Sequence, residues 1–126
     1  MKDNNKDLQI GLVLKSTGSW YEIESSEGLI IPARVRGKVR LNDYKSTNPI
    51  AVGDKVYYEK EGENAQIDSL IDRRNYIIRK SNNLSKQTQV IAANLDQAML
   101  VVTLAFPHTS LGFIDRFLLT AEAYHI

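Results

Sequence analysis

The sequence lacks several features that define whole classes of protein. It has no cysteine, which excludes disulfides and thiolate metal ligands within these residues, and its two widely separated histidines indicate no metal site. The longest apolar run, residues 98–106, is about half of what a bilayer crossing requires. No apolar stretch follows the polar first residues, so no signal peptide is indicated. We therefore expect a cytoplasmic protein with no membrane partner.

A large net charge is also absent, because the formal value is +1. The charges are instead separated along the chain. From Arg34 to Lys45, five basic side chains face the single acid Asp43, which gives a local charge of about +4. A second basic cluster between Arg73 and Lys86 contains no acid at all. Basic patches, and not the overall charge, are therefore the features that could attract an anionic partner.

Alternating apolar and polar residues predict five short strands in residues 9–72. They begin near Gln9, Trp20, Leu29, Lys55 and Ala65, and Gly-containing turns separate several of them. This spacing is typical of a small closed sheet. The longer connection at residues 36–52 is expected to hold a helical turn, which favours a five-stranded Greek-key barrel of the oligonucleotide-binding (OB) type. Residues 1–8 are expected to be a disordered N-terminus.

The character of the sequence changes after residue 72. Residues 73–88 are polar and basic and read as a linker. The apolar run Met99 to Leu104 predicts a strand covered on both faces, as in parallel α/β sheets. A helix should follow, with Ser110 as its N-cap and an apolar stripe that includes Ile114 and Phe117. Residues 89–126 therefore resemble the first strands and helix of an α/β domain that continues beyond this chain.

The basic residues are candidates for contact with RNA phosphates, since OB barrels track nucleic-acid backbones along basic grooves. Residues 34, 36, 38 and 40 occupy alternate positions, which lie on one face of an extended strand. Trp20 is expected in the core, as is one of the neighbours Tyr57 and Tyr58, whereas the loop residue Tyr44 is the better base-stacking candidate. The complete set of predicted RNA-binding residues is Arg34, Arg36, Lys38, Arg40, Tyr44, Lys45, Arg73, Arg74, Arg79 and Lys80.

For the second basic cluster, structural ion pairing is an equal alternative to RNA contact, with Asp68, Asp72 or residues beyond this chain as partners. His108, Ser110 and Asp115 lie close in sequence but form no credible catalytic triad, because Ser110 is needed as a cap and no glycine elbow surrounds it. No catalytic residue is predicted.

Five segments in order carry a resemblance to a known family. Together they resemble the N-terminal part of the RsgA/YjeQ family, circularly permuted GTPases that depend on the small ribosomal subunit. The segments are residues 36–41, 46–56, 74–79, 92–97 and 114–118. The resemblance implies that residues 9–72 form an OB-fold RNA-binding domain and that residues 89–126 begin the GTPase domain.

The resemblance also implies a role in late assembly of the small ribosomal (30S) subunit, with that subunit and its 16S rRNA as partners. A full-length member is expected to be a monomer that uses GTP and Mg²⁺ and binds Zn²⁺. This chain contains no Gly-x-x-x-x-Gly-Lys-Ser/Thr phosphate loop, and Asn94-Leu95-Asp96 lacks the lysine of the guanine motif. We therefore expect a truncated or incomplete chain that binds no cofactor and does not hydrolyse GTP.

Two alternatives remain open at the level of sequence. The barrel could be a scaffold that binds an acidic protein through its basic loop. It could also regulate the GTPase domain of the same chain without touching RNA.

Overall fold

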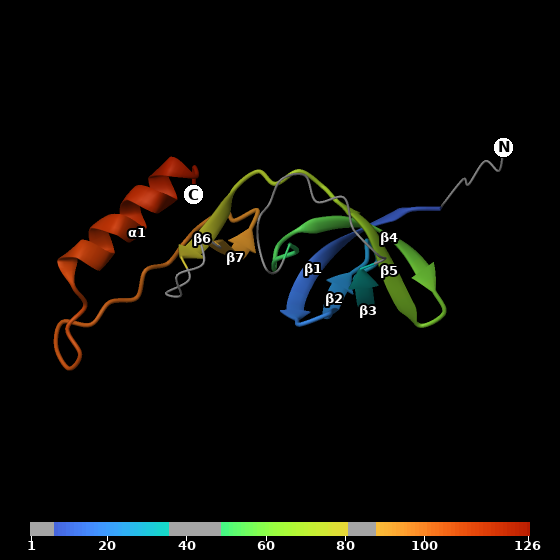
Figure 1. Ribbon diagram of the computed structural model, residues 1–126, viewed down its shortest axis with the longest axis horizontal. Coiled ribbons are helices and arrows are strands. Elements are labelled where there is room, and N and C mark those ends of the chain that lie inside the picture. The colour runs from blue at the N-terminus through green and yellow to red at the C-terminus, as the bar shows by residue number, and fades with distance from the viewer. Residues whose placement is uncertain (1–6, 36–48, 81–87) are drawn as a thin grey trace.

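The structure, a computed structural model, describes residues 7–35, 49–80 and 88–126. It contains seven described strands followed by one helix (Figure 1). The elements are β1 (Gln9–Thr17), β2 (Trp20–Glu24), β3 (Ile30–Val35), β4 (Lys55–Glu61), β5 (Asn64–Leu70), β6 (Tyr76–Lys80), β7 (Thr88–Ala93) and α1 (Leu111–Ala123). The predicted disordered start and the helical turn expected in residues 36–52 fall mainly outside the described residues.

The first five strands close into a barrel in the order β1-β2-β3-β5-β4. Its pairs are antiparallel except β3–β5, which run parallel from Ala33 opposite Ala65 to Val35 opposite Ile67. Closure comes from β1 and β4, where Gln9 lies opposite Tyr58. The prediction of a five-stranded OB-type barrel is confirmed.

Strand alternation fills the barrel interior. On β2, Tyr21 and Ile23 point inward while the residues on either side of each face out. Of the neighbouring tyrosines on β4, Tyr58 is fully buried and Tyr57 lies on the surface, as alternation requires. Tyr58 donates a hydrogen bond from its hydroxyl to Oε1 of Gln9, its partner on the neighbouring strand β1 (2.8 Å). The core therefore consists of inward-facing residues of the five strands, together with Ile50 from the segment before β4.

A separate two-stranded sheet follows the barrel. Strand β6 lies within the segment expected to be a linker and pairs antiparallel with β7, from Tyr76 opposite Ala93 to Lys80 opposite Thr88. The register shifts where Ile77 lies opposite Ala92 and Ile78 opposite Val90, so the extra residue, Ile91, lies on β7. The apolar residues of β6 are consecutive and do not alternate with polar ones, which is why the sequence pattern indicated no strand there.

The prediction of a strand at Met99 to Leu104 is wrong. The structure assigns this run no strand, and the side chains of Met99 and Leu104 are 88% and 90% exposed. A strand needs a neighbour that accepts its backbone hydrogen bonds, and the described part of the chain supplies none beside this run. Apolar composition alone therefore does not make a strand here.

The helix is as predicted at its start. The Ser110 hydroxyl accepts a hydrogen bond from the Phe113 N–H (3.2 Å), which confirms Ser110 as the N-cap. At the other end, the rings of Tyr124 and Tyr76 lie with centroids 4.7 Å apart, so the C-terminal end of α1 packs beside β6. The β6–β7 sheet thus lies between the barrel and the helix (Figure 1).

In the described residues no helix is both long and apolar enough to span a membrane.

Candidate nucleic-acid interface and the polar junction beside it

Arg34 is the first residue of the predicted basic row and the only one of its cations that lies among the described residues. It projects from the outer face of β3, near the end of the strand. The β2–β3 register pairs Tyr21 with Ala33, which places Trp20 opposite Arg34 on the outer face. The guanidinium carbon of Arg34 lies 3.8 Å from the centroid of the Trp20 ring. This is a cation–π contact on the barrel surface.

The expectation that Trp20 belongs to the core is therefore wrong. The side chain is 38% exposed. The physical reason is strand alternation, because Tyr21 and Ile23 occupy the inward positions of β2 and Trp20 therefore faces outward. Tryptophan is large and apolar, which favours burial, but its position in the strand decides which face it occupies.

The remaining members of the first basic cluster lie in the part of the chain that the structure does not describe. They are Arg36, Lys38, Arg40, Tyr44 and Lys45. Their role as RNA contacts stays a prediction.

Arg73 lies in the interior and not on an RNA-accessible surface. Its side chain is 1% exposed and pairs with Asp54, whose side chain is fully buried. The contact is bidentate: Nε donates to Oδ1 at 2.7 Å and Nη2 donates to Oδ2 at 2.6 Å. Nη2 also donates to the carbonyl oxygen of Pro49 (2.9 Å). Of the two roles predicted for Arg73, the geometry supports structural ion pairing.

The partner of Arg73 is an acid that sequence reasoning did not single out. Asp54 follows Gly53 in a turn before β4, and its carboxylate also accepts a hydrogen bond from the Ala51 N–H (2.8 Å). Its own N–H and carbonyl bond to Ala51 and Val13. A Gly-Asp pair before a strand is a common turn signal. Nothing in that signal identifies a buried ion pair with a residue 19 positions away.

The other predicted cations of the second cluster differ from Arg73. Arg74 lies on the surface and pairs with the exposed carboxylate of Asp96, with Nη2 and Oδ1 2.6 Å apart. Arg79 is exposed on β6. The backbone of Lys80 ends β6, and its side chain lies outside the described residues. Arg74 and Arg79 are therefore open to solvent, but they lie on the β6–β7 side of the molecule and not on the barrel.

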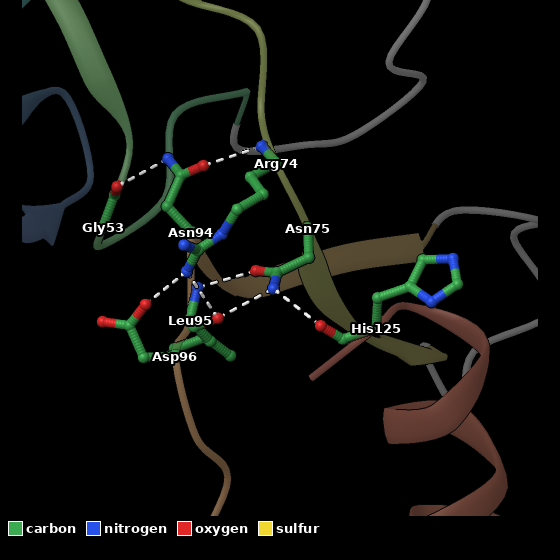
Figure 2. A network of polar contacts seen from close by, with 7 residues as sticks. All are labelled: Gly53, Arg74, Asn75, Asn94, Leu95, Asp96 and His125. Atoms are coloured by element: carbon green, nitrogen blue, oxygen red, sulfur yellow. Dashed lines mark hydrogen bonds and ion pairs between the residues drawn. The ribbon is translucent and has the colours of Figure 1, made fainter.

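Two asparagines join β6, β7 and the barrel (Figure 2). Asn94 donates from Nδ2 to the Gly53 carbonyl (2.9 Å) and accepts from the Arg74 N–H at Oδ1 (2.8 Å). Asn75 donates to the Leu95 carbonyl and accepts from the Leu95 N–H, both at 2.7 Å. Asn94 has a positive φ of 55°, a conformation that asparagine tolerates well. The sequence assigned Asn94 a turn and did not indicate its contact with the barrel.

Backbone contacts add to this junction. The Ala93 N–H donates to the Val52 carbonyl (2.9 Å), and Val52 forms a parallel bridge with Ala92. Gly53 has φ +90°, and a Cβ placed on it would lie 2.0 Å from the Ala93 carbonyl oxygen. Only glycine allows the two backbones to approach this closely. We call this set of contacts between residues 52–54 and residues 73–75 and 92–96 the polar junction.

A groove of about 670 Å³ runs beside the polar junction, between the barrel and the β6–β7 sheet. Its wall contains three cations, Lys55, Arg73 and Arg74, and two acids, Asp72 and Asp96. The charge of Arg73 is matched by buried Asp54, which leaves two cations facing two acids. This balance gives the groove no preference for an anion.

Among the described residues, no three His, Asp or Glu side chains are grouped so as to hold a metal ion.

Two domain models of one protein family together match nearly the whole chain. The model described as RsgA N-terminal domain matches residues 10–67, and the one described as RsgA GTPase matches residues 70–126.

Curated relatives agree with these matches. Proteins named small ribosomal subunit biogenesis GTPase RsgA from Bacteroides fragilis, and RsgA 2 from Bacteroides thetaiotaomicron, are 53% and 54% identical to the chain over 118 residues. In both comparisons the alignment covers 92% of this chain and 38% of the relative. The chain therefore spans little more than a third of the length of these relatives.

Solved structures give the same result. YjeQ from Thermotoga maritima is 34% identical with a TM-score of 0.61, over 93% of this chain and 38% of that one. YloQ, described as a circularly permuted GTPase, is 26% identical with a TM-score of 0.62, over 98% of this chain and 40% of that one.

Proposed function

The chain belongs to the RsgA/YjeQ family, and on that premise we propose that its barrel is the ribosomal-RNA-binding module of a GTPase that acts in assembly of the small ribosomal subunit. The observation that carries the proposal is the 53% identity to a protein named for this role, over 92% of the chain. The proposed partners are the small ribosomal subunit and its 16S rRNA, and the proposed compartment is the cytoplasm.

The enzymatic part of the proposal concerns the longer protein. A full-length member would hydrolyse GTP with Mg²⁺ and carry a zinc site outside these residues. Residues 1–126 contain no phosphate loop, so we propose that they do not hydrolyse GTP by themselves. What they would contribute is binding and orientation on the ribosomal particle.

Binding to RNA is supported by the barrel architecture and by the position of the basic row. OB barrels bind nucleic acid by tracking its backbone along a positively charged face. Arg34 lies on the outer face of β3, and four further cations follow it within eleven residues. Cations in such a row would contact phosphate oxygens, which positions the protein without reading sequence.

The salt dependence of binding tests this proposal. Displacing counterions at about five phosphates predicts a log-log slope of roughly −3.5 to −4.5 for affinity against salt concentration. The measurement is a titration of 30S subunits or a 16S rRNA fragment at several salt concentrations. A flat response would contradict RNA contact.

A charge-matched pair of variants identifies the binding face. Replacing Arg36, Lys38 and Arg40 by glutamine should abolish most of the binding while the barrel stays folded. The control replaces Lys55, Lys60 and Arg116, three exposed cations elsewhere, and so removes the same formal charge. Equal losses in both variants would mean that the overall charge, and not the basic row, attracts RNA. Binding that survives ribonuclease treatment would favour a protein partner.

The polar junction favours a second role in addition to RNA binding. It joins the barrel to β7 through the Val52–Ala92 bridge and the Asn94–Gly53 hydrogen bond. We propose that these contacts couple binding of the ribosomal particle by the barrel to the activity of the adjoining GTPase domain. In the full-length protein, replacing Asn94 by alanine should then reduce ribosome-stimulated GTP hydrolysis more than subunit binding.

A further inference from the structure

We propose that Trp20 and Arg34 form a binding site for one unpaired nucleotide, with Trp20 stacking on the base and Arg34 contacting the adjoining phosphate. The inference rests on the proposed RNA-binding function and adds a chemical class to it: single-stranded RNA rather than duplex. It uses described residues alone and does not depend on residues 36–48.

The two side chains form a preorganised pair. They lie opposite each other on adjacent strands, β2 and β3, whose register is fixed by inward packing of Tyr21 and Ala33. The guanidinium carbon is 3.8 Å from the ring centroid, a stacking distance. A side chain held in this way loses little further freedom when a ligand binds, which favours affinity.

Both side chains remain open to solvent. Trp20 is still 38% exposed with the guanidinium over its ring, and Arg34 is exposed on the strand. The guanidinium covers one face of the ring, so a base would stack on the aromatic surface that stays open. Such surface is the usual stacking platform for bases, because every base has a π-face. A guanidinium stacked on an aromatic ring keeps its N–H donors at its edge, where they match the oxygens of a phosphate.

The surrounding charges leave Arg34 available to an anion. Among the described residues no carboxylate pairs with it. Glu22 lies on the same outer face of β2, but its carboxylate is 3.2 Å from the ammonium of Lys15. The nearest acid of β2 is thus already matched by a cation, and the Trp20–Arg34 pair keeps its positive charge.

The surface beside the pair is hollowed. Ser19, Tyr21, Arg34 and Val35 line an open depression of about 270 Å³. This is slightly below the ~300 Å³ at which pockets for small molecules begin, so the depression does not enclose a metabolite. An open hollow next to a stacking surface suits a single nucleotide that continues into a strand on either side.

Trp20 reports on this site directly, because it is the only tryptophan of the chain. The experiment adds a single-stranded oligoadenylate, and separately an RNA duplex of the same length, to the 126-residue chain and follows intrinsic fluorescence. Stacking should quench the emission with the single strand and leave it nearly unchanged with the duplex. Anisotropy of a labelled oligoadenylate measures affinity in parallel.

Three variants separate stacking from charge. Trp20→Ala should weaken binding of the single strand about 5- to 150-fold, the range expected for loss of one base stack. Arg34→Lys keeps the charge but loses the planar fork, and should weaken binding several-fold. Tyr57→Ala is the matched control, because Tyr57 is also a 38% exposed aromatic side chain of the barrel, and it should change affinity less than twofold.

The outcomes distinguish this inference from the function on which it rests. RNA binding without quenching, and with Trp20→Ala as tight as the parent, would overturn the stacking site and leave the RNA-binding function standing. Failure of the parent chain to bind any RNA would overturn both. If Trp20→Ala does not fold, as judged by circular dichroism, Trp20→Leu replaces it, and the quenching of the parent chain decides in either case.

Discussion

Two ion pairs, Asp54–Arg73 within the polar junction and Asp96–Arg74 beside it, have the same chemistry and opposite surroundings. The first is buried, bidentate and completed by the Pro49 carbonyl and the Ala51 N–H. The second is exposed on both sides. Removing one member of a buried pair leaves a desolvated charge without compensation, whereas water replaces the missing partner at the surface. Their contributions to stability should therefore differ several-fold.

Matched substitutions at the two acids test this difference. Asp54→Asn should lower the free energy of unfolding by about 3–5 kcal/mol, because Arg73 remains charged in the interior. Asp96→Asn is the control and should cost no more than about 1 kcal/mol. Urea unfolding followed by Trp20 fluorescence measures both. Similar losses in the two variants would mean that Arg73 is hydrated in solution.

The barrel tyrosines give a second prediction at the scale of single residues. Burial raises the pKa of Tyr58, and the nearby charge of Glu27 adds to the effect; burial also raises the pKa of Tyr21. A phenol whose folded-state pKa lies above its unfolded value of 10.0 favours folding only while it is neutral. Barrel stability should therefore be level up to about pH 10 and fall as the pH rises through the folded-state values.

The variant Tyr58→Phe isolates this effect. It removes the ionisable hydroxyl and its bond to Gln9, so the barrel should be less stable at pH 8 but lose less stability between pH 8 and pH 11. Tyr57→Phe, at an exposed position, should keep the pH dependence of the parent. Denaturant unfolding at the two pH values compares the three proteins. An unchanged pH dependence in Tyr58→Phe would remove Tyr58 as its source.

At the scale of elements, the turn before β4 connects two sheets. Gly53 donates its N–H to the Val13 carbonyl on β1, and its own carbonyl accepts from Asn94 after β7. The turn therefore holds the barrel and the β6–β7 sheet at the same residue. A Cβ at this position would clash with the Ala93 carbonyl oxygen, and the φ of +90° is one that residues with a Cβ rarely adopt.

Gly53→Ala tests how strictly the turn fixes the two sheets. The added Cβ would meet the Ala93 carbonyl oxygen, so we expect loss of the junction as well as the cost of a positive φ for alanine, together more than about 2 kcal/mol. Gly18→Ala is the control, because Gly18 has φ +59° but open space around it, and should show the conformational cost alone, about 1–2 kcal/mol. Amide chemical shifts of β7 should move in the first variant and stay in place in the second. Unmoved β7 shifts in Gly53→Ala would contradict the close approach.

Elements were predictable from the sequence where one local pattern decided them. The five barrel strands follow from alternation, and the Ser110 cap follows from a serine before an apolar stripe. Sequence patterns gave wrong predictions where strand formation depends on a pairing strand. Strand β6 forms because β7 pairs with it, whereas residues 99–104 form no strand because no described neighbour pairs with them.

The candidate site shows the same division. Arg34 was predicted on the surface because it lies on an alternating strand, whereas the burial of Arg73 depends on Asp54, which is distant in sequence. The size of Trp20 predicts burial, whereas strand alternation places it on the outer face of β2. Its contact with Arg34 depends on the register between β2 and β3, which the sequence does not specify by itself.

At the scale of the whole molecule, apolar side chains are distributed unevenly. The barrel buries its own, whereas the run from Met99 to Phe106 and the helix leave many exposed, including Leu104, Phe106 and Leu119. Contiguous exposed apolar surface drives association in water. The chain therefore combines a well-packed half with one whose apolar surface is unpaired within the described residues.

Hydrogen exchange should reveal this division. Amides of the barrel strands should be protected, while those of residues 99–119 should exchange quickly in the monomer or become protected as the protein concentration rises. Replacing Leu104 and Phe106 by serine should reduce any self-association seen in sedimentation without affecting barrel protection. Uniform protection throughout a dilute monomer would contradict the prediction.

Closure of the barrel also has a consequence for the order of events when the chain is made. Strand β1 pairs on one edge with β2, which follows it directly, but its other edge pairs with β4, and Gln9 meets Tyr58 across 49 positions of sequence. Contacts between such distant positions form slowly, because a long loop must be ordered first. During synthesis the outer edge of the first strand therefore waits, without its hydrogen-bonding partner, until the fourth strand has left the ribosome.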